Sequence, residues 1–515
     1  MRSGIPIFLR RSVFIGFILS SGVLRAESAT WSQFRGPNGS GVAADCRPPI
    51  KPDETHRVWK TPVPAGFSSP VLSKDRVFLT ALEKGRLVTL AFDKETGKRL
   101  WRAEAPGEPT EKVHQASHQA ASTPLVDDDR VIVYFGSFGL LCYDHAGKQL
   151  WQKPIPTPKS LYGMSTSPIG FGDHVILVLD NDRNLPDSKL SQSKMVALKK
   201  ATGEVVWETG RPFNRSGWST PILWKHAGGT EIVVLGNGRL DGYDATTGEE
   251  KWFTTGFSRE TISVPVTGNG LVYGSSSKLG GSGEVKPDPE PFWASLLQFD
   301  ENKDGKIQRS EMTGPFTFPL RPELPLGHPG YGIPLPKDEE KREARRDSML
   351  TWIDKDQDGA WGREEFMSNM SVGRGKPLLM AVRPGGKGDV TETHVAWEVN
   401  RSVPEIPSPL FHDNLIYQVR KGGILSAIDT GTGEILYRTR LDAPGQYGAS
   451  PVLANGHLYF VSNPGRITVV QAGREFRPIH QFELKETVDA TPAIDEKTLY
   501  LRTEAHLLAF RRSAE

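Results

Sequence analysis

The sequence has few cysteines, almost no net charge and only one long apolar run. Its only two cysteines are Cys46 and Cys142 in 515 residues, so disulfides cannot be what stabilises a chain of this size. An oxidising compartment would permit one bond between them, but we favour two unpaired thiols, one of them buried in a strand. The formal net charge of +2, with no basic stripe, predicts no nucleic-acid partner.

The long apolar run lies near the N-terminus, from Val13 to Leu24, after three arginines and before the small residue Ala26. This order predicts a secretory signal peptide over residues 1–26, and the run is short for a bilayer span. An uncleaved N-terminal anchor is the alternative. No cysteine follows the cleavage site directly, so we expect no lipid anchor. The expected location is periplasmic or secreted, with no integral membrane span after cleavage.

A short signature, a small residue followed by proline and a β run, occurs eight times. Most copies lie 41 to 54 residues apart, and only the gap from Pro265 to Pro409 is longer. Regular spacing of this size is typical of repeat architectures. The eight copies are Ser69-Pro70, Thr123-Pro124, Ser167-Pro168, Thr220-Pro221, Val264-Pro265, Ser408-Pro409, Ser450-Pro451 and Thr491-Pro492.

A second signature closes most of the units. A glycine makes a tight turn, because it accepts positive φ at little cost, and the strand after it ends in a large aromatic residue that we expect to wedge between neighbouring sheets. Each unit therefore holds about four antiparallel strands, the size of a propeller blade. The copies span Asp93–Trp101, Asp144–Trp151, Lys199–Trp207, Asp244–Trp252 and Asp429–Tyr437.

These repeats resemble the pyrroloquinoline-quinone-type (PQQ-like) repeat family of β-propellers over nearly the whole chain after Trp31. The resemblance implies an all-β fold, a β-propeller, and the eight proline signatures predict eight blades, so the expected fold is an eight-bladed β-propeller, with a seven-bladed ring as the main alternative. The last unit, Thr491–Phe510, supplies about three strands, and His56–Pro64 is expected to complete it and remove exposed edges. Trp31–Gly41 and His114–Trp151 further resemble exported bacterial propellers labelled as similar to the outer-membrane assembly propeller.

The long gap between repeats contains two acidic twelve-residue stretches, Asp300–Glu311 and Asp354–Glu365. Each has oxygen-bearing side chains at alternate positions, glycine at position six and glutamate at position twelve. This spacing predicts a pair of calcium-binding EF-hands, because Ca²⁺ takes six to eight hard oxygen ligands. The predicted ligands are Asp300, Asn302, Asp304, the Lys306 carbonyl, Gln308 and Glu311 in the first loop, and Asp354, Asp356, Asp358, the Ala360 carbonyl and Glu365 in the second.

Flanking segments with apolar residues at helical spacing, Pro291–Phe299, Lys341–Ile353 and Glu364–Met370, support this interpretation. Two acidic turns that bind nothing are the alternative. Because the insertion falls between the second and third strands of the fifth blade, strand alternation places it on the face where the chain enters each blade. The predicted divisions are the signal peptide (1–26), an N-terminal extension (27–55), two propeller parts (56–277 and 376–515) and a small helical EF-hand insertion (278–375).

The segments that lead into each first strand supply the candidates for a binding funnel, where aromatic and charged side chains suit a small molecule or peptide. His114 and His118, four residues apart, would suit a metal on a helix, but their segment runs directly into a strand, so we do not favour a metal there. The candidates are Phe67, His118, Gln119, Tyr162, Trp218, Arg259, Glu405, Tyr447 and Asp489.

The leading hypothesis is an exported, non-catalytic binding scaffold whose funnel face meets a protein, peptide or glycan, with calcium ordering the insertion. The alternative is a PQQ-dependent oxidoreductase. Such dehydrogenases often carry a vicinal cysteine pair, whereas Cys46 and Cys142 are far apart, so PQQ is possible but not favoured. The sequence also has no GxSxG motif, P-loop or dinucleotide fingerprint.

Overall fold

The computed structural model describes residue 1 and residues 31–160, 162–180, 192–214, 217–258, 261–277, 288–319, 322–328, 331–354, 356–371 and 377–513. Apart from Met1, the predicted signal peptide lies outside these residues, as does the candidate Arg259. Among the described residues, no helix has the length and apolar character needed to cross a membrane.

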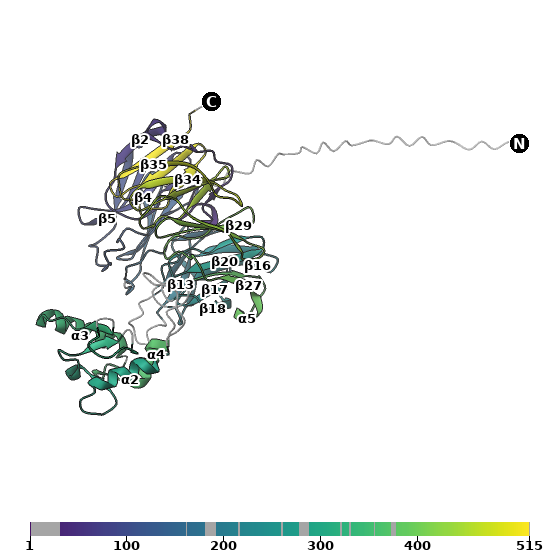
Figure 1. Cartoon of the computed structure of the whole chain (residues 1–515). Helices are drawn as coiled ribbons and strands as arrows, with labels where there is room; N and C mark the ends of the chain where they lie inside the picture. Colours follow the sequence, from purple (N-terminus) through teal and green to yellow (C-terminus); the bar gives the residue numbers. More distant parts are fainter. Residues whose placement is uncertain are drawn as a thin grey trace.

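Eight antiparallel sheets, each with four blade strands, stand in a ring (Figure 1). This arrangement confirms the eight-bladed prediction over the seven-bladed alternative. In the first four blades the strands are β3 (Val71–Leu72), β4 (Arg76–Glu83), β5 (Arg86–Asp93) and β6 (Arg99–Glu104); β7 (Leu125–Val126), β8 (Arg130–Phe135), β9 (Gly139–Asp144) and β10 (Gln149–Pro154); β11 (Ile169–Phe171), β12 (His174–Leu179), β13 (Lys194–Lys199) and β14 (Val205–Gly210); and β15 (Ile222–His226), β16 (Gly229–Leu235), β17 (Arg239–Asp244) and β18 (Glu250–Thr255).

The other four blades follow the same order. Their strands are β19 (Val266–Gly268), β20 (Leu271–Ser276), β25 (Leu378–Val382) and β27 (Val395–Val399); β28 (Leu410–His412), β29 (Leu415–Arg420), β30 (Ile424–Asp429) and β31 (Ile435–Arg440); β32 (Val452–Ala454), β33 (His457–Val461), β34 (Arg466–Gln471) and β35 (Arg477–Glu483); and β36 (Ala493–Asp495), β37 (Thr498–Arg502), β38 (His506–Arg511) and β2 (Arg57–Pro62).

Blade eight is completed from the other end of the chain, as the sequence predicts. Strand β2 pairs antiparallel with β38, and Trp59 lies opposite Ala509. The pairing covers an edge that would otherwise expose unpaired backbone groups. The outer edge of blade four is covered differently: β26 (Gly388–Asp389), just before the short helix α5 (Thr391–His394), pairs parallel with β18.

The hydroxyl of the proline signature joins neighbouring blades. At seven of the eight steps around the ring, the backbone N–H of one signature residue donates to the side-chain oxygen of its counterpart in the next blade, at 2.9–3.0 Å. The eighth counterpart, Val264, has no hydroxyl. The donor–acceptor pairs are Ser69–Thr123, Thr123–Ser167, Ser167–Thr220, Val264–Ser408, Ser408–Ser450, Ser450–Thr491 and Thr491–Ser69.

The aromatic residue of the second signature wedges between blades, as predicted. The Trp101 Nε1–H donates to the His145 carbonyl at 2.7 Å, and the Trp101 ring lies against Gly147, where a Cβ would stand 2.8 Å from it. Trp151 repeats the arrangement on Gly203 and the Lys200 carbonyl. Glycine is therefore needed twice over at these turns, for its positive φ and for the close approach of the ring.

The segment before the ring contacts the first strands of several blades. Residues 31–43 include the 3-10 turn η1 (Pro37–Gly39) and strand β1 (Val42–Ala43), which pairs parallel with β32 of blade seven. The Asn38 side chain hydrogen-bonds both backbone groups of Leu223 in blade four. Buried Arg35 donates to the Pro409 carbonyl of blade six at 2.7 Å. We call residues 31–43 the channel plug. A further 3-10 turn, η2 (Glu54–His56), precedes β2.

Between β20 and β25 the chain forms a separate helical body with its own apolar core, which includes Trp293, Phe316 and Trp361. Figure 1 shows it projecting from one side of the ring. Its elements are α2 (Glu290–Leu296), η3 (Leu297–Phe299), β21 (Ile307–Gln308), η4 (Arg309–Glu311), β22 (Thr317–Pro319), β23 (Gly332–Pro334), α3 (Glu339–Ile353), β24 (Ala360–Trp361) and α4 (Arg363–Ser371).

Candidate binding pocket and acidic loop pair

The segments leading into the blades meet in one pocket on one face of the ring. All eight contribute a lining residue, and Phe34 of the channel plug also lines the pocket. Its volume is about 180 Å³. The repeated hydroxyls give it a polar wall, since Ser69, Ser167 and Thr220 are among the lining residues. Convergence of this kind follows from the ring, because every first strand starts at the same face.

An aromatic wall belongs to blades three and four. The rings of Tyr162 and Trp218 meet edge-on with centroids 5.2 Å apart, and His114 packs edge-on against Tyr162 at 4.9 Å. The Trp218 Nε1–H donates to the Gly163 carbonyl at 2.8 Å, which fixes the indole. Phe67 lines the pocket from blade one and contacts His118, with ring centroids 5.5 Å apart.

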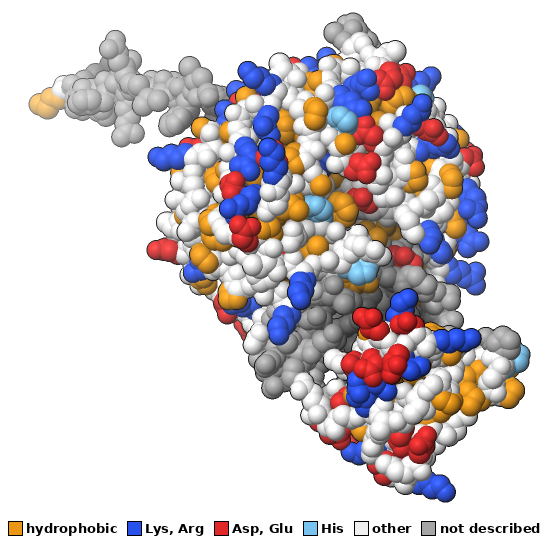
Figure 2. All heavy atoms as spheres, turned by 90° about the vertical axis from the view of Figure 1, so that its left-hand side faces the viewer, with side chains coloured by type: hydrophobic (Ala, Val, Ile, Leu, Met, Phe, Trp, Pro, Cys, Tyr) orange, Lys and Arg blue, Asp and Glu red, His pale blue; other side chains and the backbone are white. Residues whose placement is uncertain are grey.

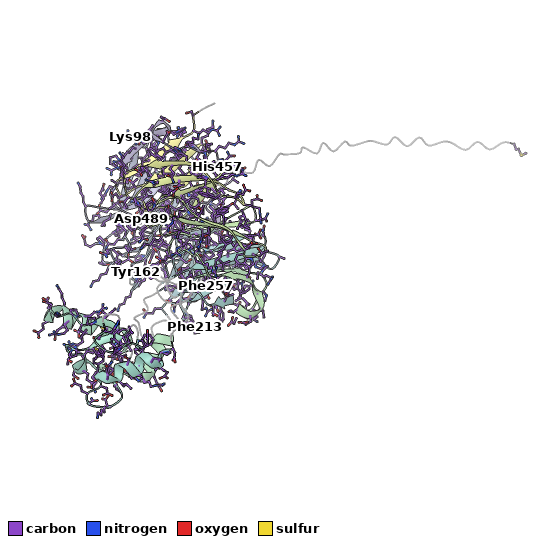
Figure 3. The ribbon with its side chains drawn as sticks, in the orientation of Figure 1. Lys98, Tyr162, Phe213, Phe257, His457 and Asp489 are labelled. Atoms are coloured by element: carbon purple, nitrogen blue, oxygen red, sulfur yellow. The ribbon has the colours of Figure 1, made fainter. Side chains whose placement is uncertain are left out.

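Asp489 is the one charged residue among the described residues that line the pocket. Its Oδ1 accepts a hydrogen bond from Asn463 Nδ2 at 2.6 Å. Burial raises the pKa of Asp489 above its ordinary value, although that hydrogen bond favours the carboxylate. In Figure 3, Asp489 and Tyr162 lie on the same side of the ring.

Four of the predicted funnel residues, Phe67, Tyr162, Trp218 and Asp489, do line the pocket. Tyr447 does not: it is buried against blade six, and its hydroxyl donates to the Ala443 carbonyl. The Gln119 side chain donates to the Glu111 backbone carbonyl instead. Glu405 does not line the pocket either, whereas its neighbour Ile406 does. Residues that the sequence did not single out, such as Ser165 and Ile262, line it because their positions in the ring bring them there.

The two histidines make local contacts. His114 Nδ1 accepts the backbone N–H of Ala116 at 3.1 Å, and His118 Nδ1 accepts that of Ala120 at 3.0 Å. Burial, together with the charge of Arg502, lowers the pKa of His118 to about 4, so this imidazole is neutral. Within the described residues, neither histidine belongs to a group of side chains placed to hold a metal.

Glu111 ties the lead-in segments of blades two and three together beside the pocket. Its buried Oε1 accepts the Met164 N–H at 2.6 Å, and its backbone carbonyl accepts from the Gln119 side chain. Among the described residues, no hydrogen-bond partner reaches Oε2. Burial raises the pKa of Glu111 to about 7, and the hydrogen bond from Met164 opposes this effect only in part.

In the helical body, each acidic loop folds around its own carboxylates. In the first, Asp300 Oδ2 accepts the Gly305 N–H at 2.9 Å, while Glu311 accepts from Glu301 and Gln308. Glu311 is only 5% exposed. Gly305 takes the positive φ of 77° that the turn requires.

The second loop repeats this pattern. Asp354 Oδ2 accepts the Gly359 N–H at 3.0 Å, and Glu365 Oε2 accepts the Gly362 N–H at 2.8 Å. Carboxylate oxygens of Asp354, Asp356 and Asp358 lie within 4.8 Å of one another. This oxygen-only donor set, on a loop with a glutamate at position twelve, has the composition that Ca²⁺ prefers.

The two loops form one unit. Strands β21 and β24 pair antiparallel, with Ile307 opposite Trp361, and Lys306 Nζ lies 2.6 Å from Asp358 Oδ2. Figure 2 looks onto the left-hand side of Figure 1 and shows the helical body standing at the edge of this face, with acidic side chains gathered on its part nearest the ring. The body is thus on the side where Tyr162 and Asp489 lie (Figure 3).

These features define a closed eight-bladed propeller whose lead-in segments meet in a funnel on one face, with a second pocket of about 440 Å³ between the channel plug and blades three to five. The sequence profile of a family described as outer membrane protein assembly factor BamB matches residues 50–167, 191–282 and 388–514, more than half of the chain. The chain belongs to this family. The unmatched residues 283–387 contain the helical body. A comparison with curated proteins found no match.

Two solved structures show the same fold. BamB from Moraxella catarrhalis is 11% identical, with a TM-score of 0.50 over 88% of this chain and 99% of that chain. The computationally designed protein Ika8 is 10% identical, with a TM-score of 0.50 over 90% of this chain and 99% of that one. At such low identity these similarities concern the fold alone.

Proposed function

We propose that this protein is an exported, non-catalytic scaffold whose funnel binds a segment of a partner protein, a peptide or a glycan. One observation carries the proposal: all eight lead-in segments converge on one pocket, which Phe34 of the channel plug also lines. A funnel with aromatic and hydroxyl walls suits binding from this face. The family description, which names an outer membrane protein assembly factor, supports a protein partner and a location outside the cytoplasm.

Binding of short peptides and oligosaccharides to the mature protein tests this proposal. Phe67→Ala and Tyr162→Leu should weaken any ligand held in the funnel, whereas Leu150→Ala, on the outer strand β10 and 44% exposed, should not. Ligands that bind both funnel variants with unchanged affinity would contradict the proposal. So would reduction of an artificial electron acceptor after reconstitution with PQQ and calcium, since that result favours the quinoprotein alternative.

We also propose that the helical body is an EF-hand pair that binds two calcium ions and is ordered by them. The predicted ligands would hold the ions through carboxylate, amide and backbone carbonyl oxygens, and the bound ions would neutralise the crowded carboxylates. The donor chemistry and the β21–β24 pairing support this role. Weak sites suffice outside the cytoplasm, because extracellular calcium-binding modules work at Kd values of about 10⁻⁴–10⁻³ M.

Calcium titration calorimetry gives the test. The unmodified protein should bind two ions, and Glu311→Gln and Glu365→Gln should each remove one site. The matched controls are Glu301→Gln and Glu364→Gln, which change neighbouring glutamates that are not predicted ligands. Unchanged stoichiometry in the first pair, or equal losses in the controls, would show that the loops are only acidic turns.

A further inference from the structure

Asp489 is the only charged side chain among the described residues that line the funnel pocket. Among the described residues, no lysine or arginine lines the pocket, and none forms an ion pair with Asp489. The nearby His118 is neutral, because its pKa is lowered to about 4. The Glu504 carboxylate adds to the negative potential at Asp489, where it helps to raise the pKa. A partly buried carboxylate without a counter-ion favours a ligand that supplies one.

The other walls suit the same kind of ligand. Blade eight, which holds Asp489, neighbours blade one, which holds Phe67, and the rings of Tyr162 and Trp218 face the pocket from the far side. Aromatic faces attract cations within about 6 Å of the ring centroid and also pack well against aliphatic stems. The chain offers no competing cation from within the described pocket lining.

The size of the pocket narrows the choice of ligand further. Its volume of about 180 Å³ is below the roughly 300–1,000 Å³ of pockets that enclose drug-sized ligands. It suits one long side chain, with the adjoining backbone outside, better than an enclosed cofactor. The hydroxyls of Ser165 and Ser167 can meet polar groups of such a segment.

We propose that the funnel recognises a lysine or arginine side chain on an extended segment of the partner protein. Its cationic head lies beside Asp489, and its stem and the neighbouring residues pack on Phe67, Tyr162 and Trp218. This inference rests on the proposed binding function and specifies the chemistry of the ligand at the same pocket.

The test uses calorimetry on the full mature protein with three capped tripeptides, Gly-X-Gly, in which X is lysine, norleucine or glutamate. Norleucine keeps the lysine stem but lacks the ammonium group. The lysine peptide should bind best, and more weakly as salt is raised. In Asp489→Asn, which keeps the shape of the side chain, its affinity should fall by about tenfold or more. Asp129→Asn removes one charge from an exposed turn and should have no effect.

The outcomes separate the two proposals. Equal binding of the lysine and norleucine peptides, or an unchanged affinity in Asp489→Asn, overturns the cation inference. If neutral peptides or glycans then still lose affinity in Phe67→Ala, the funnel remains a binding site of different specificity. If free spermidine binds as tightly as the lysine peptide and its binding also depends on Asp489, the funnel recognises a polyamine. The inference that the cation belongs to a partner protein is then overturned. Binding of no probe at millimolar concentration contradicts both proposals.

Discussion

The backbone N–H of Thr491 donates to Ser69 Oγ at 3.0 Å, and this bond joins the last blade to the first. Because 422 residues separate the two, the contact exists only once the ring has closed. It explains why the residue before proline is serine or threonine at seven of the eight repeats: the hydroxyl satisfies a buried N–H of the preceding blade. Only Val264 departs from this rule.

Thr491→Val should destabilise the ring. The nearly isosteric change removes the acceptor of the Ser450 N–H and leaves that buried donor unsatisfied. The free energy of unfolding should therefore fall by about 1–3 kcal/mol. Val264→Thr, which adds a hydroxyl at the one position that lacks it, should be tolerated with a smaller change. Chemical denaturation followed by far-UV circular dichroism measures both. A Thr491→Val protein as stable as the parent would mean that the hydroxyl ring contributes nothing.

Gly147→Ala should disturb the packing of Trp101. Both Gly147 and Gly270 have positive φ, at 91° and 75°, but a Cβ at Gly147 meets the indole at 2.8 Å, whereas Gly270 faces open space. Gly270→Ala should therefore lower the stability only by the cost of placing a Cβ at positive φ, about 1–2 kcal/mol. Gly147→Ala should lower the stability by about 1–3 kcal/mol more, because its Cβ overpacks against the indole. Equal unfolding midpoints for the two variants would contradict the wedge interpretation.

Lys306→Met should tighten calcium binding at the second acidic loop, if calcium binds there as proposed. Lys306 Nζ pairs with Asp358 Oδ2, a predicted calcium ligand, so the ammonium competes with the ion for that carboxylate. The expected gain is about twofold to fivefold in affinity, because both side chains are solvent-exposed and their pairing is screened. Lys303→Met, in the same loop, is the control for the loss of one positive charge. Calorimetry that gives the same affinity for both variants would exclude the competition.

The stability of the protein should fall as pH rises from about 4.5 to about 7. Burial raises the pKa of Glu111 from its ordinary value of 4.5 to about 7, so in this range the folded state keeps a proton that the unfolded state releases. The unfolded state is then favoured progressively, by up to about 3 kcal/mol at neutral pH. Below pH 4.5 both states are protonated, and above pH 7 both are ionised, so the contribution becomes constant.

Glu111→Gln isolates this contribution. Relative to the parent protein, the variant should gain stability steadily between pH 4.5 and 7, because glutamine can accept from the Met164 N–H without ionising. Glu108→Gln, an exposed glutamate nearby, should show no such trend. Denaturant midpoints at pH 5, 6, 7 and 8 give the comparison, and parallel curves for Glu111→Gln and the parent would show that Glu111 titrates normally.

Much of the fold was predictable because the repeat signatures are local. Ser-Pro or Thr-Pro marks the start of a blade, and a glycine turn followed by tryptophan marks its end, so counting them gives eight blades. The position of the helical body between β20 and β25 follows from the one irregular gap. The preference for unpaired thiols was also correct, since Cys46 and Cys142 are both free.

Other features could not be predicted because no short-range pattern encodes them. In blades three and four, buried Arg211 donates to Asp180 at 2.8 Å and approaches Asp241 at 3.4 Å. These charges are tolerated because they are paired and hydrogen-bonded. In sequence they look like ordinary surface residues, and only the packing of the two blades shows that they are buried.

The sequence by itself thus determined the blade count, the closing strand and the oxygen-rich composition of the acidic loops, since each depends on residues close together in the chain. The tertiary structure decided which side chains share the pocket. It brings Asp489 to a cavity lined by Phe67 and Trp218 and turns Tyr447 into the core. It also makes the channel plug from residues 31–43. These outcomes depend on closing the ring, where residues hundreds of positions apart come into contact.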